Sequence, residues 1–159
     1  MRDFSKDHRW LSINTATVRE HGDLLTIIEA CKRHGIRGLS PWRDQVAKVG
    51  LERAARAVSE AGFELSGYCR GGMFAGDASR LQEIIDDNRR AVDEAATLGA
   101  ACLVLVVGGL PQFSRPGSSP SKDIGAAREM VAAQLGLLLE YLYGNLAGLQ
   151  PFYLVLVYI

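Results

Sequence analysis

Residues able to bind a ligand follow each of the first three apolar segments of the chain. Asn14 and Thr15 follow the first segment, Trp42 and Arg43 follow the second, and Arg70 follows the third. A guanidinium group holds a phosphate or a carboxylate through paired hydrogen bonds, so both arginines are candidates for gripping an anionic ligand. Surface ion pairs are the alternative role for the arginines, and covering the core is the alternative role for Trp42.

Glycines extend the same pattern. Gly71 and Gly72 follow Arg70, and Gly109 follows the fourth apolar segment. A residue without Cβ lets the backbone approach a ligand closely, although an ordinary turn uses glycine equally well. We therefore include these three glycines among the candidate ligand contacts.

Two residues are candidates for moving protons. Glu20 and His21 come just after the first apolar segment, and both side chains can act as general acids or bases. The spacing of the remaining residues does not reveal a Ser-His-Asp or Cys-His arrangement. Glu20 and His21 are therefore candidate catalytic residues.

One pattern recurs along the chain and must position these residues: a helix, a glycine, a strand and a loop. We expect helices at about 24–34, 51–61, 81–98 and 123–142, with the charged residues at 86–94 forming a solvated helix face. Strands are expected at 11–17, 36–40, 63–69 and 102–107. The last strand is apolar without alternation, which is typical of a parallel strand buried on both faces. Alternating helices and strands predict an α/β fold with a parallel sheet, either doubly wound or part of a (β/α)8 barrel.

Composition excludes several classes of function. The 159 residues carry 18 basic and 18 acidic side chains, so bulk charge predicts neither nucleic-acid nor membrane binding. No apolar run approaches the ~20 residues that span a bilayer, and the charged N-terminus does not resemble a signal peptide, so we expect a cytoplasmic protein. The three cysteines lie far apart, and neither a phosphate-binding P-loop nor a dinucleotide-binding glycine pattern is present.

The ordered set of strand and exit-loop segments resembles one family. Residues 11–17, 35–43, 68–74 and 102–110 look like the first four strand units of the sugar phosphate isomerase/epimerases, which are xylose-isomerase-like TIM barrels. The resemblance covers about residues 9 to 142. It implies a partial barrel of about four to five strands, with residues 1–143 as an N-terminal half barrel and 144–159 as an atypical apolar C-terminal segment.

The family also implies a chemistry. A divalent metal (Mn, Mg, Zn or Co) polarises a hydroxyl or carbonyl group of a sugar or polyol while protein side chains move protons. The metal ligands of the family come mainly from the later strands. When residues 144–151 are laid on the fifth-strand pattern, Gln150 takes the position of a metal-binding Glu. An amide is a weaker ligand for such a cation than a carboxylate.

We therefore expect a truncated isomerase-like chain with weak or no activity, because the metal-binding strands are missing from it. A non-enzymatic half barrel that self-associates, or that pairs with another half barrel through open strand edges, is one alternative. An open-sheet binder of small molecules is another. Strand order distinguishes a barrel from an open sheet, because strands that neighbour one another in chain order indicate an arc of a barrel. A reversal of that order indicates a doubly wound sheet.

Overall fold

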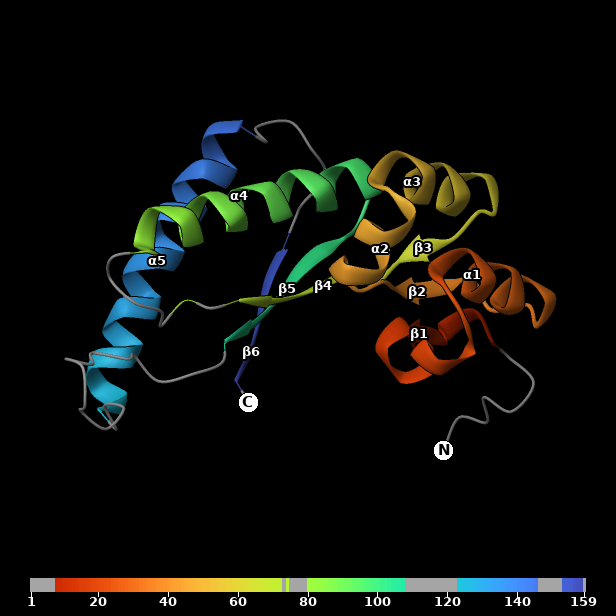
Figure 1. The fold of residues 1–159 in the computed structure, drawn as a ribbon, viewed down its shortest axis with the longest axis horizontal. Helices are drawn as coiled ribbons and strands as arrows, with labels where there is room; N and C mark the ends of the chain where they lie inside the picture. The colour runs from red at the N-terminus through yellow and green to blue at the C-terminus, as the bar shows by residue number, and fades with distance from the viewer. Residues whose placement is uncertain (1–7, 73, 75–79, 108–122, 146–152, 159) are drawn as a thin grey trace.

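A computed structural model describes residues 8–72, 74, 80–107, 123–145 and 153–158. Helices and parallel strands alternate along the chain (Figure 1). In chain order the elements are η1 (His8–Trp10), β1 (Ser12–Asn14), η2 (Thr15–His21), α1 (Leu24–Arg33), β2 (Gly38–Ser40), α2 (Arg43–Val49), α3 (Leu51–Glu60), β3 (Glu64–Leu65), β4 (Tyr68–Gly72), α4 (Leu81–Leu98), β5 (Cys102–Val107), α5 (Ile124–Asn145) and β6 (Tyr153–Tyr158).

The strands form two parallel ribbons in sequential order, β1-β2-β3 and β4-β5-β6. Backbone contacts connect the ribbons. The amide of Ala101 donates to the carbonyl of Leu65 at 3.2 Å, and Trp42 forms a parallel bridge with Cys69. Strands β3 and β4 are consecutive pieces of one strand line, so the order along the arc is β1, β2, β3 with β4, β5 and β6, without the reversal of a doubly wound sheet. This confirms the expected partial barrel.

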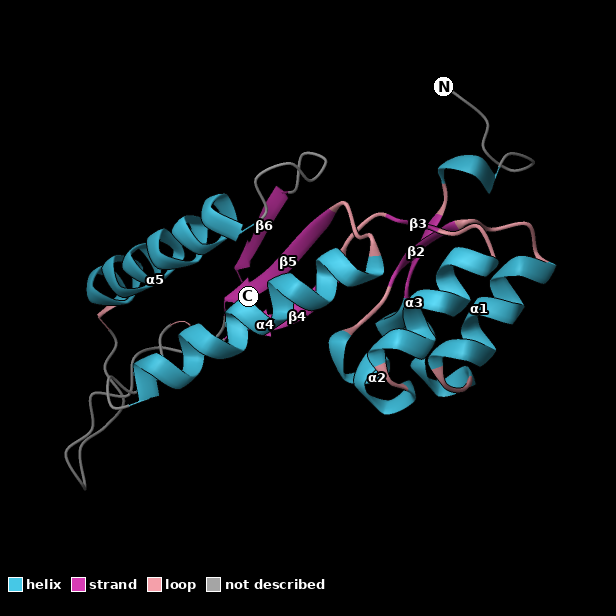
Figure 2. Cartoon of the chain, turned by 90° about the horizontal axis from the view of Figure 1, so that it is seen from above, coloured by secondary structure: helices cyan, strands magenta, loops and turns pink. Residues whose placement is uncertain are grey.

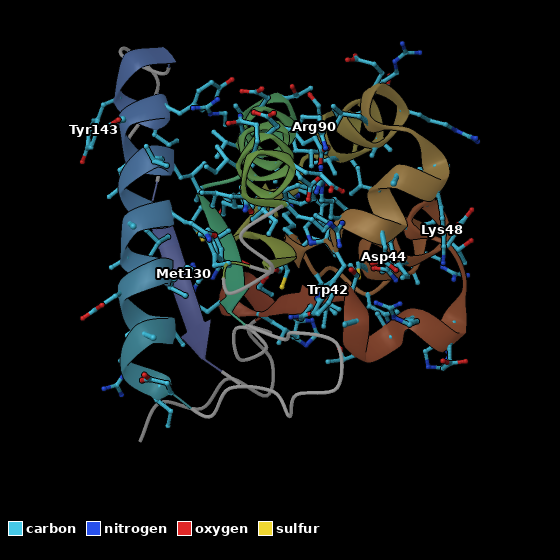
Figure 3. All side chains as sticks on the ribbon, turned by 60° about the vertical axis from the view of Figure 1, so that its left-hand side comes forward. Trp42, Asp44, Lys48, Arg90, Met130 and Tyr143 are labelled. Atoms are coloured by element: carbon cyan, nitrogen blue, oxygen red, sulfur yellow. The ribbon has the colours of Figure 1, made fainter. Side chains whose placement is uncertain are left out.

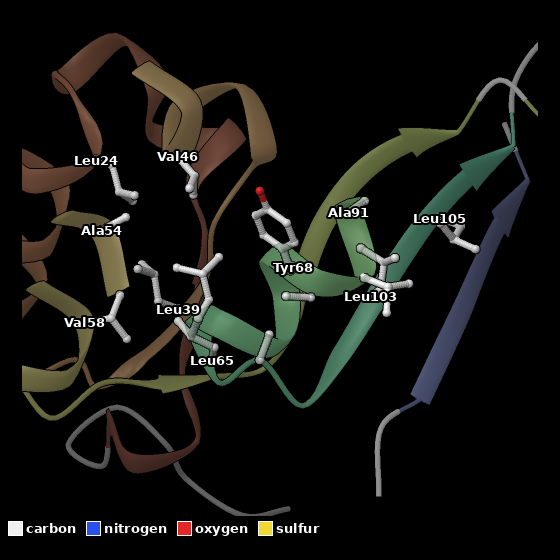
Figure 4. Close-up of a cluster of buried hydrophobic side chains, with 14 of the residues drawn as sticks. Leu24, Leu39, Val46, Ala54, Val58, Leu65, Tyr68, Ala91, Leu103 and Leu105 are labelled. Atoms are coloured by element: carbon white, nitrogen blue, oxygen red, sulfur yellow. The ribbon is translucent and has the colours of Figure 1, made fainter. Parts of the chain in front are cut away.

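The helices cover the strands on the outer side of this arc. Helices α1, α2 and α3 lie together over β1–β3, and α4 runs along β4 and β5 (Figure 2). Between them lies a core in which Leu39, Tyr68, Leu103 and Leu105 are fully buried (Figure 4). No helix in the described part of the chain is long and apolar enough to cross a membrane.

Helix α1 shows how the sequence specifies these elements. Its buried residues recur with helical spacing, and the Asp23 carboxylate caps its first turn by accepting from the Thr26 amide at 2.8 Å. Gly35 follows the helix with a φ of +68°, a backbone conformation that favours glycine. The residues of the buried face are Leu24, Ile27, Ile28 and Cys31.

Several expected boundaries differ from those of the structure. The first strand ends at Asn14, because the Asn14 side chain caps η2 by accepting from the Ala16 amide at 3.0 Å. The expected loop after the second strand is a helix, α2, which Gly50 separates from α3 with a φ of +88°. The third strand is split at Ser66–Gly67, where a Cβ on Gly67 would lie 3.1 Å from Cys102 Sγ.

The C-terminal apolar segment also pairs with the arc. Strand β6 runs parallel to β5 with six residue pairs in register, from Cys102↔Tyr153 to Val107↔Tyr158. The preceding helix, α5, extends to Asn145, three residues beyond its expected end. Gln150 lies outside the described residues.

Candidate ligand-binding site

The exits of β1 and β2 are joined by side chains that the sequence placed among the candidates. The indole Nε1 of Trp42 donates to the Asn14 Oδ1 at 2.7 Å. Asn14 is exposed and Trp42 is half-buried, so part of each is available to a ligand. The indole is therefore held at the carboxyl ends of two neighbouring parallel strands, which is where a barrel places its functional site.

Thr15 and Gln45 form a buried hydrogen-bonded pair that also holds the backbone of Trp42. Thr15 is fully buried, and its hydroxyl donates to Oε1 of Gln45 while accepting from the Trp42 amide at 3.0 Å. The Gln45 Nε2 donates in turn to the Thr15 carbonyl at 3.3 Å, and only 4% of Gln45 is exposed. These contacts support a positioning role for Thr15, while its contact with a substrate stays a prediction.

Arg19 completes the cluster from η2. Its guanidinium carbon lies 5.7 Å from the centroid of the Trp42 ring, a cation–π distance, and its Nη1 is 3.0 Å from the Asp44 carboxylate. Figure 3 shows Trp42 and Asp44 close together on this side of the molecule. Arg19 also borders a cavity of about 230 Å³, which Gly22, Asp23, Leu24, Gln45 and Lys48 line as well. We call Asn14, Thr15, Arg19, Trp42 and Gln45 the exit cluster.

Arg43 makes a different set of contacts. Its Nε and Nη2 donate to the two carboxylate oxygens of Glu94 at 2.6 and 2.8 Å, and its Nη1 donates to Asp87 at 2.9 Å. The guanidinium is thus held by two carboxylates of α4, and its side chain is 20% exposed. The structure supports the ion-pair role that the sequence left open, and binding of a substrate by Arg43 stays a prediction.

The partial burial of Asp87 and Glu94 shows that one expectation about α4 was wrong. We expected all the charged residues at 86–94 to form a solvated face, yet the side chains of Asp87 and Glu94 are only 30% and 24% exposed. They lie seven residues apart, two helical turns, and so share one side of the helix. That side of α4 contacts Arg43 and is only partly exposed to solvent.

Tyr68 joins this network from β4. Its hydroxyl donates to the Glu94 Oε2 at 2.8 Å, and its ring is fully buried. Burial raises the pKa of Tyr68, and the hydrogen bond with Glu94 raises this pKa further, so the phenol stays a neutral donor. The hydrogen bond to Glu94 likewise raises the pKa of Arg43. We call Arg43, Tyr68, Asp87 and Glu94 the α4 network.

The other predicted site residues are not part of the exit cluster. Arg70, Gly71 and Gly72 form the carboxyl end of β4, where the side chain of Arg70 lies outside the described part, as does Gly109. Glu20 and His21 are exposed in η2. The His21 ring lines a second, largely apolar cavity beside β1, and its catalytic role stays a prediction.

The described residues do not provide the metal site that the family resemblance implies. Within residues 8–72, 80–107 and 123–145, no three His, Cys, Asp or Glu side chains lie close enough together to hold a metal ion. Asp44, a carboxylate that contacts the exit cluster, pairs with Arg19. We therefore derive no catalytic step through a metal for this chain.

Comparisons with known proteins found similar solved structures but no matching protein family. No protein-family model matches the chain, and no curated protein matches it. Among solved structures, protein SMc04130 from Sinorhizobium meliloti 1021 is 49% identical over 91% of this chain, with a TM-score of 0.77. The chain spans about half the length (49%) of that protein.

Two more distant structures share the fold. The IolI protein with a bound zinc atom is 15% identical with a TM-score of 0.64, over 93% of this chain and 51% of IolI. The 3-keto-D-glucoside 4-epimerase YcjR from E. coli is 20% identical with a TM-score of 0.61, over 83% and 50% of the two chains. This chain has the fold of half a xylose-isomerase-like TIM barrel.

Two members of the exit cluster in this half barrel were missed from the sequence. Gln45 is a polar residue beside buried Val46 on the inner side of α2, and a polar residue on an apolar face signals a buried hydrogen bond. Arg19 lies in η2, whose residues we expected partly in the first strand and partly in the loop after it, so its position over Trp42 could not be inferred.

Proposed function

We propose that this half barrel binds a sugar or polyol derivative at the exit cluster and belongs to an isomerase or epimerase of carbohydrate metabolism. The observation that carries the proposal is the contact between Trp42 and Asn14, which holds an indole at the carboxyl rim of the arc. An indole face packs on the C–H groups of a sugar ring, while Asn14 and Arg19 offer polar groups for its hydroxyls.

Two structural neighbours support the class of reaction. One is a 3-keto-D-glucoside 4-epimerase, and another contains zinc. In a complete barrel of this family, a divalent metal would assist proton transfer on the substrate. Because the described residues do not gather three ligands for such a metal, we propose that this chain alone has weak or no isomerase activity.

Ligand binding is testable through Trp42. The chain has two tryptophans, Trp10 and Trp42, so Trp10→Phe leaves Trp42 as the only indole reporter. Titration with an aldose, a ketose and a cyclic polyol should change the Trp42 emission in a saturable way for at least one of them. Arg56→Gln, on the exposed side of α3, is the control and should leave the titration unchanged. Unchanged emission with every class of compound would remove the support for a sugar site.

Metal binding tests the second part of the proposal separately. Equilibrium dialysis of the purified chain with Mn²⁺, and again with Zn²⁺, should show weak binding without a defined stoichiometry. Tight binding of one ion per chain would contradict the proposal of an inactive half and would justify an assay for isomerase activity.

A further inference from the structure

We propose that Glu94 is a positioning residue, which holds the Trp42 indole in place by fixing Arg43 at the start of α2. Glu94 lies in α4 and is not a member of the exit cluster. The inference goes beyond the proposed function, because the position of an indole can be measured without a ligand. Only its last test, on ligand affinity, rests on the proposed function.

Trp42 belongs both to the strand exit and to the helix that follows it. Its amide donates to the Thr15 hydroxyl at 3.0 Å, and its backbone forms a parallel bridge with Cys69. Its carbonyl accepts from the amides of Gln45 and Val46, both at 3.0 Å, in the first turn of α2. A movement of the start of α2 therefore moves the backbone that carries the indole.

Helix α2 depends on other elements for its position. It has seven residues, Arg43–Val49, and Trp42 as its N-cap makes no side-chain capping hydrogen bond. A helix this short is marginal by itself, and tertiary contacts supply most of its stability. The contacts of Arg43, its first residue, thus determine where the helix starts.

Glu94 makes the most specific of these contacts. Its Oε2 accepts from Arg43 Nε at 2.6 Å, and its Oε1 accepts from Arg43 Nη2 at 2.8 Å. Paired hydrogen bonds between charged groups fix direction as well as distance. The side chains of Arg43 and Glu94 are 20% and 24% exposed, so solvent screens this pair less than it screens a surface ion pair.

Two further residues hold the pair. The Tyr68 hydroxyl donates to Glu94 Oε2 at 2.8 Å, and Figure 4 shows the buried Tyr68 ring between Val46 of α2 and Ala91 of α4. Asp87 accepts from Arg43 Nη1 at 2.9 Å. Each nitrogen of the Arg43 guanidinium therefore donates to a carboxylate of α4.

The hydrogen bond on the other side of Trp42 is less protected. Asn14 accepts from the indole at 2.7 Å, but Asn14 is exposed, so water competes with this contact. The contact is kept only while the backbone of Trp42 stays in place. The half-buried pair of Arg43 and Glu94 meets that requirement.

The first experiment measures acrylamide quenching of Trp42 in the ligand-free Trp10→Phe chain. Glu94→Gln keeps the size of the side chain but replaces one acceptor oxygen with an amide group that donates. We expect the quenching constant to rise and the emission to shift to the red relative to the Trp10→Phe parent. Unchanged quenching and emission would overturn the proposal.

Glu83→Gln is the matched control in the same helix. Glu83 accepts from Arg80 through two hydrogen bonds of 2.8 and 2.9 Å, but its side chain is 64% exposed. It lies about three helical turns before Glu94. Glu83→Gln should leave the quenching of Trp42 unchanged, and an equal rise in both variants would show a general loosening of α4 and overturn the positioning role.

Asp87→Asn keeps the test decisive if Glu94→Gln does not fold. It removes the charge that faces Arg43 Nη1 and leaves the two hydrogen bonds with Glu94 in place. We expect a smaller rise in quenching in the same direction, read where urea denaturation shows that the chain is fully folded. Unchanged quenching of the folded Asp87→Asn chain would then overturn the proposal.

A combination of variants tests whether Glu94 acts through Arg43. Once Arg43→Met has removed the guanidinium, loss of the carboxylate should have no further effect on the indole. The quenching constant of R43M/E94Q should therefore equal that of Arg43→Met. Additive increases would contradict the route through Arg43.

Ligand affinity is the last readout. A sugar or polyol that binds the Trp10→Phe parent should bind Glu94→Gln about tenfold more weakly and Glu83→Gln equally well. Equal affinity of Glu94→Gln and the parent would overturn the role of Glu94 in presenting Trp42 to a ligand. If no compound binds the parent, the proposed function fails, and the quenching measurements still decide the positioning role.

Discussion

The indole nitrogen of Trp42 lies 2.7 Å from the amide oxygen of Asn14, although 28 residues separate them in the chain. Asn14→Ala removes this acceptor, so we expect the unfolding free energy to fall by about 1 kcal/mol and ligand affinity to fall by about tenfold. The emission of Trp42 in the Trp10→Phe background should report both changes. Asn14→Asp keeps an oxygen at this position and should retain most of the stability, and an equal loss in both variants would contradict the role of the acceptor.

Thr15→Val tests the support beneath this contact. The two side chains have similar shapes, but valine cannot accept from the Trp42 amide or donate to Gln45. We expect a loss of about 1–3 kcal/mol of stability in urea denaturation, because buried polar partners are left unsatisfied. Thr15→Ser retains the hydroxyl and should lose less; similar losses would show that the methyl group matters more than the hydrogen bonds.

The α4 network gives a prediction about charge pairing. Arg43→Met leaves Glu94 half-buried without its two guanidinium hydrogen bonds, so we expect a destabilisation of about 2–3 kcal/mol. Arg43→Lys keeps the charge but cannot contact both oxygens together, so its loss should be smaller, at about 1 kcal/mol. Chemical denaturation of both variants measures the difference, and a fully stable Arg43→Met would show that the network does not stabilise the fold.

The cap of α1 predicts a dependence on pH. Hydrogen bonds from Thr26 hold the pKa of Asp23 below its ordinary value of 3.8. The carboxylate therefore stabilises the fold at neutral pH, and this contribution is lost as the pH falls through the folded-state pKa. Asp23→Ala should lower the melting temperature at neutral pH. The effect should be smaller at about pH 3, which lies below the usual pKa of an Asp side chain. An effect of the same size at both pH values would contradict the assignment.

Much of the architecture was predictable from the sequence, since it depends on local signals. Glycines after helices, such as Gly35, and an apolar run at Cys102–Val107 mark where helices end and where a buried strand runs. The length of the first strand was not predictable, because Asn14 ends it through a side-chain cap that competes with the strand. Helix α2 was missed since a short segment after Pro41 and Trp42 is typical of a loop.

The candidate site was predictable only in part. Asn14 and Trp42 were identified because they follow strands, and the structure brings them together. The partners of Arg43 could not be inferred, since Asp87 and Glu94 lie in a distant helix whose charges looked fully solvated. Which of two roles an arginine adopts depends on tertiary contacts that spacing along the chain does not encode.

The sequential order of the strands also bears on how the chain folds. If β3 and β4 are taken as one strand line, each line pairs with the one before it, so a nascent chain emerging from the ribosome can complete one strand pair before the next strand is made. Contacts between neighbouring segments close short loops and so favour rapid folding over pathways that join distant ends. If β1, β2 and β3 assemble early with α1, the strands made later can pair with the edge of a sheet that has already formed.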